Sequence, residues 1–108
     1  MNMRIYLKDM TEMLEYTNRN KELIFRIIHK RINDHIHTNI ESIFLFDIFL
    51  TDYSIVVQNI AVRSEWKNSL ILAIEYFEKS EDYETCYDML QTLDRLEKQI
   101  GGTLPPNL

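Results

Sequence analysis

The chain has 108 residues, 45% hydrophobic and 27% charged, a balance that excludes a disordered chain and is typical of one soluble globular domain. Its net charge of −5 lies in the C-terminal part, since residues 1–67 carry nine acidic and nine basic groups whereas residues 68–108 carry eight and three. An acidic segment repels phosphate, which argues against nonspecific nucleic-acid binding by that part.

Cysteine content and apolar segments indicate where the protein works. Cys86 is the only cysteine, which excludes an internal disulfide, and the N-terminus lacks the apolar core of a secretory signal. Charged and amide side chains interrupt the most apolar region, residues 40–62, before it reaches a membrane-spanning length. We therefore expect a reduced, cytoplasmic protein. Its many isoleucines and asparagines, which A/T-rich codons encode, indicate a low-GC bacterium or its phage as the source.

The positions of glycine and proline favour helices. Both glycines and both prolines lie within residues 101–106, so residues 1–100 lack the residue types that the many turns of an all-β domain use. We expect a single all-α domain over residues 1–100, a small bundle of four to five helices. Residues 101–108 are expected to follow it as an extended C-terminal tail.

Two amphipathic helices are expected before residue 38. One face of the first holds Tyr6, Met10, Met13 and Leu14. A polar break at residues 17–20 then offers N-caps for the second helix, from about residue 21 to residue 37. Isoleucines recur in this second helix at every fourth position, 24, 28, 32 and 36.

Residues 38–62 are expected to form the third and central helix. Thr38 and Glu41 fit a capping box, and the residues that follow are apolar nearly all round, as in a helix packed on several sides. The alternative makes residues 54–62 a β-strand, because this stretch is rich in β-branched side chains.

The last two helices should form an antiparallel hairpin, because only a short turn separates them. The fourth begins at Ser64–Glu65, with Trp66, Leu70, Ala73, Ile74 and Phe77 on its apolar stripe. Ser80 is expected to cap the fifth helix, and Gly101 to end it. Its buried stripe is predicted to contain Cys86, Met89, Leu90, Leu93, Leu96 and Ile100.

Residues 73–99 of this hairpin resemble the UVR-type helical hairpin of nucleotide-excision-repair proteins. Tyr83–Glu84 stands where that family has an aromatic residue followed by Glu, and Met89, Leu93 and Leu96 stand at its apolar positions. Leu90 replaces an arginine of the family pattern, and Cys86–Tyr87 replaces a pair of small residues. The resemblance covers a quarter of the chain and implies an element that docks onto another protein.

Side chains that carry out chemistry do not combine into a catalytic or metal site. The three histidines, His29, His35 and His37, point to three different faces of one predicted helix, and no HxxxH pair or cysteine pair exists. His35 is expected to be hydrogen-bonded beside the apolar face, and Cys86 to be a buried, unreactive thiol. Asp47, embedded in apolar residues, is expected in a surface notch. We therefore expect no catalytic residue, no metal and no cofactor.

Two surfaces remain as candidate partner contacts. A basic stripe contains Arg19, Arg26, Lys30 and His37. It is either a solvated face that the acidic C-terminal helices offset, or a contact for an acidic partner. An acidic hairpin surface with tyrosines contains Tyr76, Glu81, Asp82, Tyr83 and Tyr87, a composition typical of protein-binding faces.

These features predict a small non-enzymatic protein–protein interaction module, such as an adaptor, an inhibitor or a regulatory subunit. Two alternatives are a structural or assembly subunit of a homomeric or virion complex, and a nucleic-acid binder that uses the basic stripe. The overall charge counts against the last of these.

Overall fold

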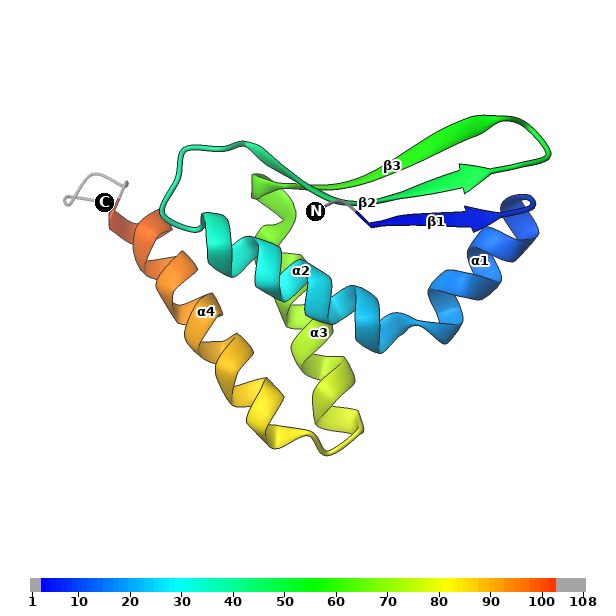
Figure 1. The fold of residues 1–108 in the computed structure, drawn as a ribbon. Helices are drawn as coiled ribbons and strands as arrows, with labels where there is room; N and C mark the ends of the chain where they lie inside the picture. The colour runs from blue at the N-terminus through cyan, green and yellow to red at the C-terminus, as the bar shows by residue number, and fades with distance from the viewer. Residues whose placement is uncertain (1–2, 103–108) are drawn as a thin grey trace.

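The protein forms two layers, a three-stranded sheet and a layer of helices on one side of it (Figure 1). The computed structural model describes residues 3–102, with side chains as far as residue 99. In chain order the elements are β1 (Arg4–Leu7), α1 (Met10–Arg19), α2 (Lys21–His35), β2 (Ser42–Leu50), β3 (Ile55–Val62), a 3₁₀ turn (Arg63–Glu65), α3 (Trp66–Lys79) and α4 (Tyr83–Gly102).

β2 is the central strand, with β1 parallel on one side and β3 antiparallel on the other. Parallel neighbours require a long crossover, which α1 and α2 supply. β2 and β3 instead form a hairpin through residues 51–54, where Ser54 takes the left-handed conformation at φ 52°. A bulge at Leu45 interrupts the pairing of β2 with β3.

The all-α prediction is wrong, and the errors lie in residues 4–7 and in residues 38–62. The expected central helix is the β2–β3 hairpin, and the alternative that made residues 54–62 a strand is confirmed by β3. A run that is apolar on all sides suits a strand between two neighbours as well as a central helix. One hairpin does not need glycine, since Ser54 accepts the positive φ. Thr38 caps no helix; its hydroxyl donates to the His35 carbonyl at 2.8 Å, beyond the end of α2.

The expected boundaries of the other elements also need correction. Tyr6 belongs to β1, and α1 begins only after Asp9, whose carboxylate accepts the Glu12 N–H at 3.0 Å. Asp82 rather than Ser80 precedes α4 as its cap and accepts the Thr85 N–H at 3.2 Å. The Ser80 hydroxyl donates back to carbonyls of α3.

The C-terminal end of α4 also departs from expectation. The helix continues through Gly102, so Gly101 neither ends it nor begins an extended tail. Leu90 is half-exposed instead of buried. The Ile100 side chain and residues 103–108 lie outside the described part. None of the helices in residues 3–102 has the length and apolar character that a bilayer span requires.

The core lies between the sheet and the helices α2 and α3. Its fully buried side chains include Ile32, Ile48, Leu50, Trp66 and Leu70. Burying one such side chain stabilises the fold by about 1.5–3 kcal/mol. The Trp66 indole N–H donates to the Ala61 carbonyl at 3.0 Å, so its polar group is satisfied inside the core. A smaller cluster between α3 and α4 contains Ala73, Phe77, Cys86 and Met89.

Two isoleucines of the β2–β3 hairpin provide a test of this arrangement. We expect Ile48→Ala to lower the free energy of unfolding by about 2–5 kcal/mol, because it leaves a cavity at a fully buried site. Ile55→Ala, at a position 49% exposed, should cost less than about 1 kcal/mol. Urea unfolding followed by circular dichroism measures both, and equal losses would contradict the position of the core.

Candidate functional site

The three histidines lie apart, each in a different environment. His37 is exposed beyond the end of α2, and the His35 ring contacts the Arg31 carbonyl. His29 is half-buried against α4, where its Nε2 lies 2.9 Å from the Thr92 hydroxyl. Burial lowers the pKa of His29, with Arg95 adding to the effect and Asp88 opposing it. Residues 3–102 contain no group of three or more His, Cys, Asp or Glu side chains that could hold a metal ion.

The structure connects the basic stripe to the acidic hairpin. Arg26 pairs with Asp82 at 3.2 Å and with Glu22 at 3.6 Å, and its guanidinium lies over the Phe77 ring. Hydrogen bonds from Thr85, and then the Arg26 charge, lower the pKa of Asp82. These contacts use side chains from both candidate surfaces to join α2 to the hairpin.

The other cations of the stripe also have acidic neighbours. Arg19 lies 4.0 Å from Glu15, and Lys30 lies 3.0 Å from Asp34, each within its own helix. This arrangement favours the interpretation of the stripe as a solvated face whose charge is offset within the chain. His37, on the turn that follows α2, does not extend the helical stripe.

The tyrosines of the hairpin separate into packed and free side chains. Tyr76 is half-buried, with its ring 5.4 Å from that of Phe25 and 5.1 Å from that of Phe77. Tyr83 and Tyr87 are 63% and 59% exposed and share one stripe of α4 with the half-exposed Leu90. Glu81 sits in the turn before α4 with φ 61°. An apolar strip therefore remains on the outside of the hairpin.

A second free apolar surface lies elsewhere, on the side of the sheet opposite the helices, which Figure 1 shows below the sheet. Ile5 and Leu7 point to the core, so the alternating residues of β1 point to the other side. The register then places the following residues on the surface that we call the open face: Arg4, Tyr6, Phe44, Asp47, Phe49, Val56, Gln58, Ile60 and Val62.

Cross-strand pairing arranges the open face in rows. Tyr6, Phe49 and Val56 form one apolar row, with the Tyr6 and Phe49 rings 5.7 Å apart. Phe44 and Ile60 form another. Tyr6 is 64% exposed and Ile60 52% exposed, so these rows are in large part accessible. Sheet faces that meet water are ordinarily polar, which makes these rows unusual.

A polar row of Arg4, Asp47 and Gln58 separates the two apolar rows. Arg4 donates to Asp47 Oδ2 at 3.3 Å. The Tyr6 hydroxyl and then the Asp47 carboxylate raise the pKa of Arg4, and desolvation opposes them. Asp47 Oδ1 is buried and has no hydrogen-bond partner among the described residues. A buried acceptor without a donor costs about 1–3 kcal/mol, so this oxygen calls for an explanation.

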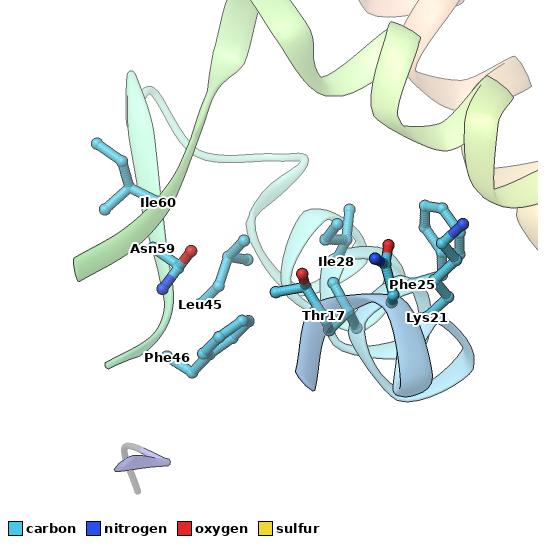
Figure 2. A pocket seen from close by; sticks show the side chains of 10 residues that line it. Thr17, Lys21, Phe25, Ile28, Leu45, Phe46, Asn59 and Ile60 are labelled. Atoms are coloured by element: carbon cyan, nitrogen blue, oxygen red, sulfur yellow. The ribbon is translucent and has the colours of Figure 1, made fainter. Parts of the chain in front are cut away.

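A cavity of about 380 Å³ lies on the other side of the sheet, beneath β3 (Figure 2). Its walls come from β2, β3, α2 and the junction of α1 with α2, with no lining residue from β1, α3 or α4. Ile28 and Phe46 make it apolar, while Lys21 and Asn59 add polar groups. It therefore lies at the β3 side of the core, where the helical layer leaves the sheet incompletely covered.

The sequence contained one signal for the open face. Residues 43–50 are apolar at every position except Asp47, which in a strand means that both faces are apolar. We expected Asp47 to lie in a surface notch. It lies instead in the central strand and is only 8% exposed. Which face the helices leave open depends on the crossover and is not encoded in this stretch.

Comparison of the chain with protein-family models, with curated proteins and with solved structures finds no match. The UVR-type resemblance of residues 73–99 thus stays a prediction. The candidate site is defined by the geometry of this chain alone.

The lowered pKa of His29 predicts a pH-dependent stability. The folded state favours the neutral ring of His29. The contribution of His29 to the free energy of unfolding is therefore complete above the unfolded pKa of about 6.5, and it is lost as the pH falls through the lower pKa of the folded state. We expect the melting temperature to fall between pH 7 and pH 5.5, and His29→Gln to flatten this dependence. His37→Gln, at an exposed site, is the matched control. Identical slopes for wild type and His29→Gln would contradict the assignment.

Proposed function

We propose that this protein is a small non-enzymatic protein–protein interaction module that binds its partner through the open face of the sheet. An adaptor, an inhibitor or a regulatory subunit would each fit this description. One observation carries the proposal: two accessible apolar rows flank a polar row on the side of the sheet that the helices leave open.

The apolar rows supply the affinity in this proposal. Single exposed apolar side chains are common on proteins, but contiguous apolar patches on a surface mark interaction sites. Tyr6 and Phe49 are in contact, and Val56 continues their row across the sheet. Aromatic side chains of this kind dominate the binding energy of protein interfaces.

The polar row supplies specificity. Asp47 Oδ1 is already buried within the chain, so a partner meets mainly the half-exposed Arg4 guanidinium and the exposed Gln58 carboxamide of this row. Arg4 already offsets the charge of this carboxylate at the other oxygen. The expected partner surface is therefore apolar, with a central polar group that accepts hydrogen bonds from Arg4.

The other candidate surfaces have secondary places in this proposal. The strip of Tyr83, Tyr87 and Leu90 could serve as a second contact, which is the role that the UVR-type resemblance implies. The nucleic-acid alternative loses support, because acidic side chains of the same chain lie beside Arg19, Arg26 and Lys30. The cytoplasmic setting expected from the single cysteine remains part of the proposal.

Matched lysine substitutions test the open face. We expect Tyr6→Lys to weaken partner binding tenfold or more, because a charge replaces an aromatic side chain in an apolar row. Leu72→Lys is the control, since Leu72 is 57% exposed on α3, away from the sheet. A partner isolated by affinity capture from the source cells is titrated against each purified variant by calorimetry.

A third variant, Tyr83→Lys, tests the competing surface on α4. If Tyr83→Lys abolishes binding while Tyr6→Lys binds like wild type, the contact belongs to the hairpin and the proposed role of the open face is wrong.

A further inference from the structure

β3 is an edge strand whose outer side pairs with no described element. The Arg63 N–H donates to the Glu41 carbonyl at 2.7 Å, so the backbone of residue 63 turns toward β2. Successive residues of a strand turn their backbone groups to opposite sides. The N–H and C=O groups of Val56, Gln58, Ile60 and Val62 therefore point to the free side, and we call them the β3 edge.

The β3 edge lacks the features that protect edge strands from pairing. Natural edges carry lysine, proline or a bulge, or are very short. Residues 55–62 contain no charged residue and no proline, and the bulge of the hairpin lies in β2 at Leu45. β1, the other edge, has only four residues and carries Arg4. The eight residues of β3 are thus the one long unprotected edge in the described sheet.

We propose that β3 pairs antiparallel with β3 of a second copy of the chain, forming a two-fold symmetric dimer with one continuous six-stranded sheet. The proposal concerns the edge of the sheet and goes beyond the partner-binding role of its open face. Antiparallel pairing of a strand with its own copy satisfies a two-fold axis, so the assembly closes at two copies.

The direction of the backbone groups and the pairing of the whole edge together select one register. Residues whose backbone groups point outward must lie opposite each other. These residues all have even numbers, so the numbers of any two paired residues add to an even sum. Centring the axis on Asn59 places Val56 opposite Val62 of the second copy and Gln58 opposite Ile60 of the second copy. Every outward backbone group of the β3 edge is then paired, and the turn at residues 51–54 stays outside the pairing.

One feature, the pairing of Asn59 with itself, favours a second copy over a foreign strand, and two others allow a second copy to bind here. Both copies carry a net charge of −5, and an uncharged edge allows them to approach without like charges in contact. Asn59 meets its own counterpart, and a carboxamide is self-complementary because it has both donors and an acceptor. The apolar cavity beneath β3 lies beside Asn59, so the second copy would extend the sheet beyond the incompletely covered part of the core.

A proline substitution tests the edge with the full chain. We expect wild type to have twice the 13.0 kDa chain mass in size-exclusion chromatography with light scattering. Gln58→Pro should raise the dimer dissociation constant roughly thirtyfold or more, because it removes two symmetry-related hydrogen bonds. Gln58→Ala keeps the N–H and should remain dimeric. A monomeric wild type, or dimers of equal strength in both variants, would overturn the proposal.

Cysteine cross-linking tests the register and does not depend on tolerance of proline. Cα atoms of a directly opposed, non-hydrogen-bonded pair lie about 4.5 Å apart, within disulfide reach. Asn59→Cys should therefore form a covalent dimer on mild oxidation. Gln58→Cys places its two Cα atoms roughly 8 Å apart and should not. Cross-linking through Gln58→Cys alone would overturn this register, as would failure of both.

The two proposals can fail separately. Tyr6 lies on β1, two strands from the β3 edge, so Tyr6→Lys leaves the dimer contact intact. A monomeric wild type that still loses its partner on Tyr6→Lys overturns the dimer alone. A dimer whose partner binding ignores Tyr6→Lys overturns the role of the open face alone.

Discussion

The structure depends on β2, which is the one strand of the described sheet with a neighbour on each side. Its parallel pairing with β1 requires a long crossover, and α1 and α2 fill that crossover on one side of the sheet. Ile48 and Leu50 are fully buried on that side, beneath the helices. The same strand is apolar on its other side, which the helices do not reach. One constraint therefore produces both the core and the open face.

The open face and the β3 edge both follow from this one-sided covering. In this chain α2 of the crossover and α3 after β3 pack on the same side of the sheet, so apolar groups of β2 and β3 remain accessible on the other side. The two surfaces offer different groups. The open face offers side chains around the buried, unpartnered Asp47 Oδ1, and the uncharged β3 edge offers backbone N–H and C=O groups. A two-fold pairing at β3 would join two open faces on one side of a larger sheet, which would enlarge the surface offered to a partner.

Charge has a mainly internal role in this protein. Arg26 ties α2 to the turn before α4 through Asp82, and it covers the Phe77 ring. Residues expected to form a basic surface and an acidic surface thus hold two parts of the fold together. Such exposed pairs contribute little individually, and high salt should weaken them. Tyr83 and Tyr87 remain exposed on the outer side of the α3–α4 hairpin.

The sequence alone determined the helices with a clear apolar period. The expected ranges of α2 and α3 agree closely with the structure, because isoleucines at every fourth position and the Trp66 to Phe77 stripe fit only a helix face. Residues 38–62 could not be assigned this way, since a run that is apolar on every side has no period. Pairing with β1, more than thirty residues away in sequence, makes that run a strand. The open face and the unpartnered Asp47 Oδ1 follow from that distant pairing, so only the tertiary structure decided them.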